Sequence, residues 1–377
     1  MNEQELTYSI ALANLDTLSL LNAKLLIEAA GSAAEIFSHR KDIKSIVPDA
    51  NDRLVHAFDN VDNAMRLAEK EMEFIKKKNI RALTLSDEDY PQRLLECEDA
   101  PIVLYACGNA ELNRKHIINI IGTRKCTEYG RESCRNFVAE LKELVPDTLI
   151  VSGLAYGIDI HAHRASLENG MDTVGVLAHG LDRIYPSVHR QTAAEMIHNG
   201  GGLITEYISG TTPEKHNFVR RNRIVAGICD ACVVIESAAK GGSLITANLA
   251  LNYNREVFAF PGRTYDESSA GCNNLIKNHE ANLITCANDL VELMRWGTPS
   301  KSKNKQAVQQ ELFLELSTEE QAVIETLKNV DDKHINQIVV ESGVPYSQAT
   351  MVLFELEMKG VVTALGGARY HLKRKLS

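Results

Sequence analysis

The run KHNFVRRNR, which begins at Lys215, holds the residues whose types point most directly to a ligand. Its cationic or potentially cationic side chains are Lys215, His216, Arg220, Arg221 and Arg223. Because the chain has a formal net charge of -9, such a cluster indicates a local anion-binding site rather than a generally basic surface. Phe218 lies among the charges, and cations beside an aromatic ring suit single-stranded nucleic acid, since the ring can stack on a base. The same run also fits a solvated helix face with Phe218 in the core, so the residues alone leave both interpretations open.

Three glycine-containing loops have the composition of phosphate-binding segments. They are GTRK (122–125), SGLAYG (152–157) and KGGS (240–243), and each follows an apolar, strand-like run. Glycine lets the backbone approach an oxyanion, and a helix that begins at such a loop offers free N–H groups. Any one of them could be merely a tight turn, but three at the carboxyl edge of one sheet favour a ligand with several phosphates. The candidate binding residues are Gly122, Thr123, Arg124, Ser152, Gly153, Lys215, Phe218, Arg221, Arg223, Lys240, Gly241, Gly242 and Ser243.

Other site chemistries are not favoured by the sequence. The turn GTRKCTEYG does not match the dinucleotide fingerprint, and neither a Walker A sequence nor a Gly-x-Ser-x-Gly elbow is present. Asp159, His161 and His163 are spaced by two, so they cannot share one helix face as metal ligands. We expect Asp159 to be a helix cap or a partner of the helix dipole, and His161 to be a hydrogen-bonded internal residue. The sequence therefore predicts no catalytic group, metal or cofactor.

The cysteines favour a reduced, cytoplasmic protein. Eight are scattered through the sequence, as is common where disulfides do not form. Cys229 and Cys232 have a metal or redox spacing, but no second ligand pair stands at a suitable distance, so we expect a structural role for them. With 44% hydrophobic and 24% charged residues, the chain has an ordinary globular composition, and we expect neither a signal peptide nor a membrane span.

Apolar runs of strand length alternate with helical patterns between residues 82 and 298, which predicts an α/β fold with a largely parallel, doubly wound sheet. The expected strands are 82–85, 102–106, 117–121, 149–152, 173–177, 203–205, 232–235 and 257–260. Helical patterns between them include 131–144, 160–168 and 243–251.

The flanking segments indicate two further parts. Residues 1–80 show helical periodicity throughout, which predicts a small helical domain before the core at 81–298. A polar stretch at 299–316 has the composition of a linker. Beyond it, Ser317 and Glu320 form a capping-box pattern, and three helical segments precede a hairpin-like ending with Gly366 and Gly367 at its turn. We interpret 317–377 as a winged-helix domain.

The assembled motifs resemble the DprA family, also called DNA-processing or Smf proteins. The matching stretches, in the family's order, are IIGTRKCTEYG, SGLAYGIDIHAHRAS, TVGVLAHGLDRIYPSVH, GGLITEY, FVRRNRIVAGICD, ESAAKGGSLITANLA and FAFPGR. The resemblance implies an extended Rossmann-like core that binds single-stranded DNA without catalysis, delivers it to RecA, and supports natural transformation and recombination. It also implies a homodimer formed through the core, a possible encounter with single-strand-binding protein, and phosphate contacts at 122–124, 218–223 and 240–243.

Two segments depart from the family's pattern. Many relatives carry a helix-hairpin-helix with a Gly-x-Gly hairpin near the start, but residues 15–22 (LDTLSLLN) contain no glycine, so we expect packing or partner binding there. The presumed recognition helix contains Glu355 and Glu357, with Lys359 as its one cation, whereas duplex readout needs Arg or Lys. Basic residues gather only in the tail, at Arg369, Lys373, Arg374 and Lys375. Partner binding, or a weak DNA contact through the tail, therefore fits this domain better than operator recognition.

Two rival functions remain at this stage. Rossmann-like nucleotide hydrolases of the lysine-decarboxylase-like group also bind phosphate at glycine loops, but their Pro-Gly-Gly-x-Gly-Thr signature is absent and Glu236 precedes the KGGS loop. The second rival function is that of a winged-helix transcription regulator with a ligand-sensing core, and the acidic recognition helix disfavours this interpretation.

Overall fold

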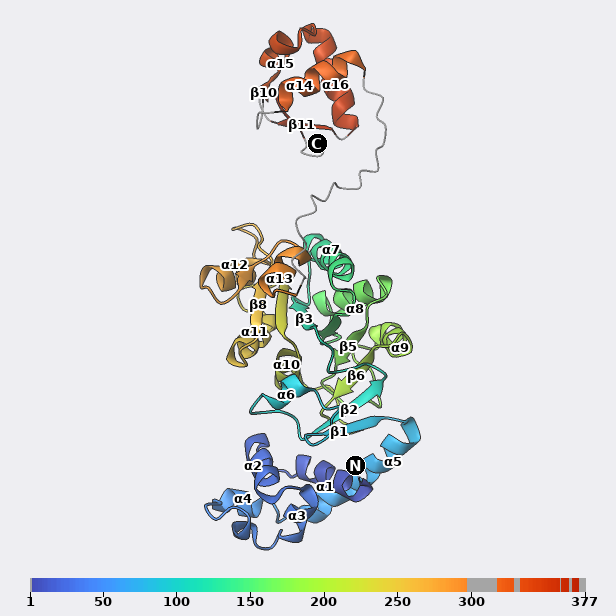
Figure 1. Cartoon of the computed structure of the whole chain (residues 1–377), viewed down its shortest axis with the longest axis vertical. Coiled ribbons are helices and arrows are strands. Elements are labelled where there is room, and N and C mark those ends of the chain that lie inside the picture. Colours follow the sequence, from blue (N-terminus) through green and yellow to red (C-terminus); the bar gives the residue numbers. More distant parts are fainter. Residues whose placement is uncertain (1, 297–316, 329–332, 360, 366–367, 373–377) are drawn as a thin grey trace. The chain divides into compact units, whose positions relative to one another are not determined.

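A computed structural model describes residues 2–296, 317–328, 333–359, 361–365 and 368–372 of the chain (Figure 1). It divides into two compact units, Met1–Pro299 and Ser300–Ser377. The predicted linker at 299–316 lies outside the described residues. None of the described helices is both long and apolar enough to cross a membrane.

A nine-stranded sheet forms the centre of the first unit, in the order β1-β2-β6-β5-β4-β3-β7-β8-β9. Neighbouring strands from β6 to β9 pair in parallel, whereas β1 and β2 join that edge in antiparallel pairs. The expected largely parallel sheet is thus confirmed. The strands are β1 (Arg81–Thr84), β2 (Val103–Gly108), β3 (Ile117–Gly122), β4 (Leu149–Ser152), β5 (Thr173–Val176), β6 (Gly202–Thr205), β7 (Ala231–Glu236), β8 (Glu256–Ala259) and β9 (Asn282–Leu283).

Helices cover both faces of the sheet, which is why its central strands are apolar along their whole length. One face packs against α7 (Glu128–Leu144), α8 (Ile158–Glu168) and α13 (Ala287–Leu293). The opposite face packs against α6 (Gln92–Leu95), α10 (Lys215–Gly227), α11 (Gly242–Asn252) and α12 (Ala270–Lys277). Helix α9 (Arg190–His198) contributes to a smaller cluster beside β5 and β6.

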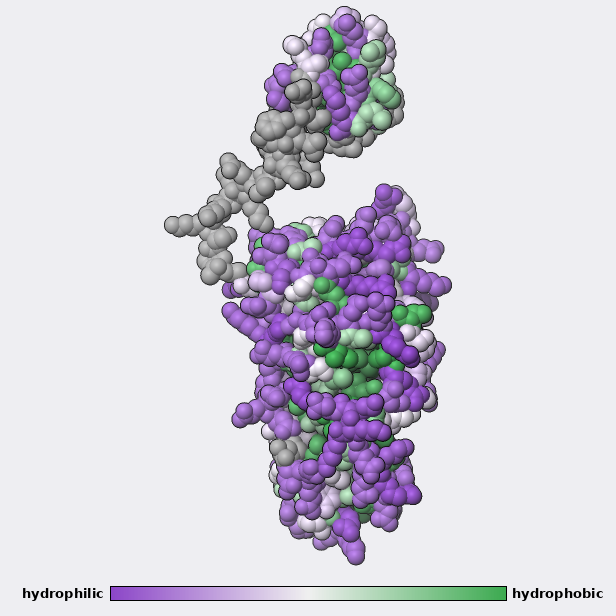
Figure 2. All heavy atoms as spheres, turned by 90° about the vertical axis from the view of Figure 1, so that its right-hand side faces the viewer, coloured by the Kyte–Doolittle hydropathy of each residue, from purple (hydrophilic) through white to green (hydrophobic). Residues whose placement is uncertain are grey.

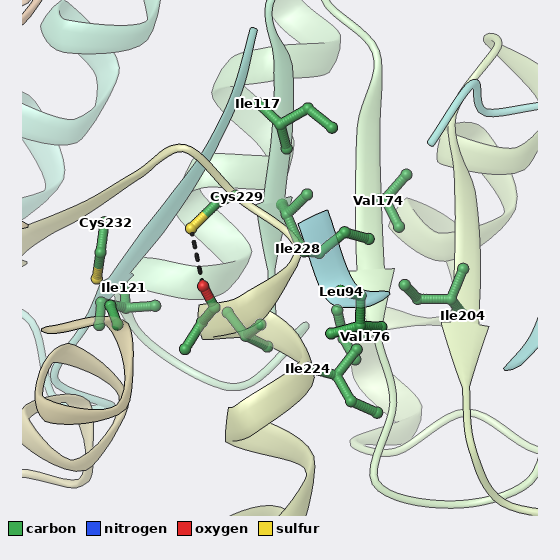
Figure 3. Packing of buried hydrophobic residues seen from close by; sticks show 14 of the residues in the cluster. Leu94, Ile117, Ile121, Val174, Val176, Ile204, Ile224, Ile228, Cys229 and Cys232 are labelled. Atoms are coloured by element: carbon green, nitrogen blue, oxygen red, sulfur yellow. Dashed lines mark hydrogen bonds between the residues drawn. The ribbon is translucent and has the colours of Figure 1, made fainter. Parts of the chain in front are cut away.

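The packing beneath α10 matters most for the site, because it fixes how that helix is rotated. Figure 3 shows Ile224 and Ile228 at the end of α10 beside Val176 and other apolar side chains of the sheet. Cys229 donates a weak hydrogen bond to the Ala226 carbonyl, and Cys232 is buried in β7. The two cysteines are therefore packing residues, and burial raises the pKa of the Cys229 thiol to about 12.

The amino-terminal helices are α1 (Glu3–Ala13), α2 (Leu20–Ala30), α3 (Ala33–Ser38), α4 (Asp52–His56) and α5 (Val61–Lys78). Their apolar faces share one core with Ile102, Val103 and Tyr105 at the sheet edge. The expected helical character of this segment is confirmed. Because the shared core joins it to the sheet, the boundary expected near residue 80 falls inside the first compact unit.

The second unit contains α14 (Thr318–Leu327), α15 (Ile335–Ser342) and α16 (Tyr346–Met358) with a small sheet in the order β10-β12-β11. Its strands are β10 (Lys333–His334), β11 (Val362–Leu365) and β12 (Arg369–Leu372). Ser317 and Glu320 form the predicted capping box at the start of α14. The expected turn glycines Gly366 and Gly367, and the basic tail residues Lys373, Arg374 and Lys375, lie outside the described residues.

Candidate nucleic-acid interface

A cleft of about 720 Å³ opens at the carboxyl edge of the parallel strands in the first unit. The loops after β3 and β4, one face of α10 and the amino end of α11 supply much of its walls. Of the residues proposed from the sequence, ten line this cleft: Gly122, Thr123, Arg124, Gly153, Lys215, Phe218, Arg221, Gly241, Gly242 and Ser243. Segments that are distant in sequence thus meet at one place, as expected for a ligand site at the edge of an open α/β sheet.

The loop after β3 is held so that Arg124 extends from it. Thr123 donates its backbone N–H to the Glu236 carbonyl at 2.7 Å and accepts the Ile158 N–H at 3.2 Å. Gly122 packs against Ile158, and a Cβ there would clash with that side chain. Gly122 and Thr123 are thus fixed by their contacts, whereas the side chains of Arg124 and Lys125, which follow them, are exposed at the cleft.

Gly153, after β4, sits against two charged groups and has no room for a side chain. Its N–H donates to Asp159 Oδ2 at 3.1 Å, and its carbonyl accepts from Arg221 Nη1 at 2.7 Å. A Cβ on Gly153 would lie 2.6 Å from both Arg221 Nη2 and Asp159 Oδ2. The glycine is therefore required by close packing of the backbone against this charged pair.

Arg221 is a buried cation at the floor of the cleft, only 3% exposed. Besides Gly153 it donates to the Val176 carbonyl, so its guanidinium is held by backbone from two strand ends. Burial lowers the pKa of Arg221 to about 10, which leaves it charged at neutral pH. Burial also raises the pKa of Asp159, against the opposing effect of Arg221. The floor thus presents a fixed positive charge that is partly offset by the Asp159 carboxyl.

Helix α10 presents one face to the cleft and a different one to a buried carboxylate. Lining residues Phe218, Arg221, Asn222 and Val225 follow the spacing that places side chains on one helix face. Arg223 lies outside that face. It is buried and forms an ion pair with Glu206, which also contacts Arg220 at 3.3 Å. This corrects the expectation that Arg223 faces the ligand, because its charge is committed to Glu206.

An aromatic pair forms one side of the cleft. The Phe218 ring lies edge-on to Tyr185 with centroids 5.8 Å apart. The guanidinium carbon of Arg124 is 5.2 Å from the Phe218 centroid, and that of Arg221 is 5.9 Å away. Phe218 is half-buried and Tyr185 is 47% exposed. The ring therefore lies among cations at the cleft rather than in the core.

Helix α11 points its amino end into the cleft. Its N-cap residue is Gly241, which has no side chain to occupy the first N–H groups, and a Cβ at Gly242 would meet no atom of the described chain within 4 Å. Such an end is a favourable place for an anion, because the free N–H groups and the helix dipole act together. Ser243 Oγ donates to Ser237 Oγ at 2.8 Å, which holds the loop.

Two further proposed residues do not line the cleft. Ser152 is fully buried, and its Oγ donates to the Ile120 carbonyl at 2.6 Å, so it joins β4 to β3 instead of facing a ligand. Lys240 is exposed next to the α11 amino end but is not part of the lining. It stays a proposed contact for a strand that continues beyond the cleft.

Sequence reasoning missed several lining residues, among them Lys125, Tyr185 and Asn222. Lys125 adjoins Arg124, and Asn222 lies on the same α10 face as Phe218, so their positions could have been found from the loop and from helical spacing. Tyr185 offered no such signal, because its segment lies far from α10 in sequence.

The acidic and histidine residues of α8 act within the fold. Asp159 lies in the first turn of α8, where an acidic residue suits the helix dipole. It does not cap the helix, because the N-cap Gly157 has no side-chain hydrogen bond and Asp159 accepts the Gly153 N–H instead. The internal histidine is His163, whose Nδ1 pairs with Thr173 Oγ1 at 2.7 Å and whose pKa burial lowers to about 3. The expectation for His161 was wrong in this respect, because that residue is only half-buried.

Comparison with known proteins identifies two matching family models and several similar chains. A family model described as "DNA recombination-mediator protein A" matches residues 81–295, and one described as "DprA winged helix domain" matches 310–368. The chain is 38% identical to the DNA processing protein DprA of Streptococcus pneumoniae over 210 residues, 56% of this chain and 73% of that protein. It is 32% identical to protein Smf of Escherichia coli over 308 residues, 80% of each chain.

A solved structure is similar to the core. The DNA processing protein A of Helicobacter pylori, whose structure is described as giving insight into a unique single-stranded DNA binding mode, matches with a TM-score of 0.52 and 28% identity. The match covers 58% of this chain and 97% of that one.

Proposed function

The chain belongs to the DNA-processing protein A (DprA, or Smf) family, and from this premise we propose that it binds single-stranded DNA in the cleft beside α10. The observation that carries the proposal is that Phe218 lies near both Arg124 and Arg221 in a cleft that the amino end of α11 also lines. The similarity to the Helicobacter pylori protein supports the same ligand.

Each part of the cleft has a role in this proposal. The α11 amino end and the side chains of Arg124 and Lys215 bind backbone phosphates, since these groups are exposed or uncapped. The rings of Phe218 and Tyr185 stack on bases, because the bases of a single strand are not paired and their faces are accessible. Arg221 contributes charge from below while its N–H groups hold the backbone of Gly153.

We also propose that the protein acts without catalysis. Glu236, the carboxylate that precedes the KGGS loop, is buried and accepts hydrogen bonds from Thr127 N at 2.8 Å and Thr127 Oγ1 at 2.7 Å. It therefore caps the start of α7 rather than facing the cleft, which weighs against its use as the general base of a nucleotide hydrolase.

At the level of the cell, family membership supports a role in DNA recombination. We propose that the protein delivers bound single strands to the RecA recombinase during recombination and natural transformation. We further propose that it works as a homodimer formed through the first unit and that it meets single-strand-binding protein on the same DNA.

Strand selectivity tests the proposed ligand. Because base stacking on an aromatic ring requires unpaired bases, we expect a single strand to bind at least about ten times more tightly than duplex of equal length. A gel-shift titration of both forms measures this, and a nucleotide-hydrolysis assay on the same preparation tests for catalysis. Equal affinity for the two forms would refute the proposal, and hydrolysis that Glu236→Gln abolishes would favour the enzyme.

A further inference from the structure

The outer face of α16 in the second unit carries large apolar side chains that its own core does not use. Met351, Phe354 and Met358 are 66%, 63% and 75% exposed. The opposite face of the helix is buried, through Ala349, Val352, Leu353 and Leu356. Figure 2 shows apolar residues at the surface of this unit beside hydrophilic ones. Apolar residues that gather on an exposed face mark an interaction site.

Their spacing describes the kind of surface that would fit. Ser347, Met351, Phe354 and Met358 are separated by four, three and four residues, all within α16. Side chains at this spacing form a straight stripe along one helix face, and the alternation of four and three is the spacing of a helix–helix seam. We call these four residues the α16 seam. It is complementary to another α-helix.

The charges beside the α16 seam are acidic. Glu355 and Glu357 are exposed and flank it on opposite sides, as their positions on the helix require. Lys359, at the end of the helix, is turned away to Glu320 at 2.6 Å. The described lysines elsewhere in the unit are also paired, Lys328 with Glu325 and Lys333 with Glu341.

This charge pattern selects among possible occupants. DNA phosphates would be repelled by the flanking carboxylates. A second copy of the same helix would bring glutamates against glutamates, and such like-charge contacts disfavour pairing. A helix whose apolar stripe is flanked by lysine or arginine would not be repelled, because its charges are opposite to those of Glu355 and Glu357. We propose that the α16 seam docks an amphipathic α-helix of a partner protein with basic residues on both sides of its apolar stripe.

Two designed peptides test this proposal on the full chain. Both span about three heptads, with leucine at the a and d positions; one carries lysine and the other glutamate at the e and g positions. Fluorescence anisotropy with labelled peptides should show that the lysine peptide binds at least about tenfold more tightly, since opposite charges then face each other across the seam. Equal binding of the two peptides, or binding of neither, would overturn the proposal.

Variants of the chain assign the binding to the seam. Phe354→Glu should weaken binding of the lysine peptide at least about tenfold, as expected when a central apolar contact is lost. Val340→Ser is the matched control, because Val340 is 80% exposed on α15 but lies outside the seam, and it should bind as the unaltered chain does. The double variant Glu355→Lys, Glu357→Lys should reverse the preference and favour the glutamate peptide.

Two further measurements distinguish a protein partner from self-association and from DNA binding at the α16 seam. If sedimentation shows self-association that Phe354→Glu abolishes, the occupant is a second copy and the proposal is wrong. Single-strand affinity should be the same for Phe354→Glu and the unaltered chain, because the cleft belongs to the first unit. A loss of that affinity would mean that the seam serves DNA binding and would contradict a protein partner.

Discussion

The guanidinium carbons of Arg124 and Arg221 lie 5.2 Å and 5.9 Å from the centroid of the Phe218 ring, so two cations are close to this aromatic side chain. The ring is only half-buried, so it contributes less to the core than a fully buried phenylalanine. A base that stacks on it would lie next to two cations, where its own phosphates can be neutralised. The same position would therefore combine stacking with charge.

Truncating this ring separates stacking from stability. Phe218→Ala should lower single-strand affinity about tenfold or more, because stacking contributes about 1–3 kcal/mol per base, while the melting temperature barely changes. Phe74→Ala on α5 is the matched control, since Phe74 is also partly buried but packs against the amino-terminal core. Anisotropy titration and thermal unfolding measure the two effects. A large fall in melting temperature of Phe218→Ala would refute the stacking role.

At the scale of elements, the segment that leads from β6 into α10 is anchored by a helix from the amino-terminal region. Glu71 of α5 accepts hydrogen bonds from Ser209 N at 2.8 Å and Ser209 Oγ at 2.5 Å. The Glu71 residue is only 3% exposed, and this burial raises the pKa of its carboxyl above 4.5. Helix α5 therefore helps to fix the approach to α10, and so the direction of its cleft-facing residues.

This anchor predicts a pH dependence of stability. A raised pKa means that the folded state holds the Glu71 proton to higher pH than the unfolded state does, so this group makes the protein less stable as pH rises from 4.5 through the raised pKa. Glu71→Gln cannot titrate. The stability of Glu71→Gln relative to the unaltered protein should therefore increase over that window. Urea denaturation at a series of pH values measures it, and a difference that does not change with pH would contradict the assignment.

At the scale of the whole molecule, the positive charge is local. The chain carries a net charge of -9, yet the cleft is lined by Arg124, Lys125, Lys215 and Arg221. If the cleft binds nucleic acid as proposed, the net negative charge of the chain disfavours non-specific binding elsewhere on it.

Salt dependence measures how many of these cations meet phosphate. The logarithm of the single-strand binding constant should fall with the logarithm of salt concentration by about 0.7 per phosphate neutralised. Arg124→Ala should reduce this slope by about 0.7. Arg223→Ala should leave the slope unchanged but lower thermal stability, because the buried Glu206 then keeps only its contact with the more exposed Arg220. An unchanged slope for Arg124→Ala would remove Arg124 from the phosphate-binding set.

The sequence by itself determined the elements and where their loops meet. Apolar strand runs and helical spacing are local properties, so β3, β4 and β7, with the glycine loops that follow them, could be predicted to within a residue or two. The capping box at Ser317 is local as well. Because parallel strands end at one edge, these loops could also be expected to lie together.

Only the tertiary structure decided which charges are available. Arg221 and Arg223 are two residues apart and chemically identical, yet one forms the cleft floor and the other is paired with Glu206. That difference depends on how α10 is rotated, and the rotation is set by Ile224 and Ile228 packing on the sheet. Tyr185 and Glu206 reach α10 from other parts of the chain. Contacts between distant segments depend on the packing of the whole core, so they could not be predicted from the local sequence pattern.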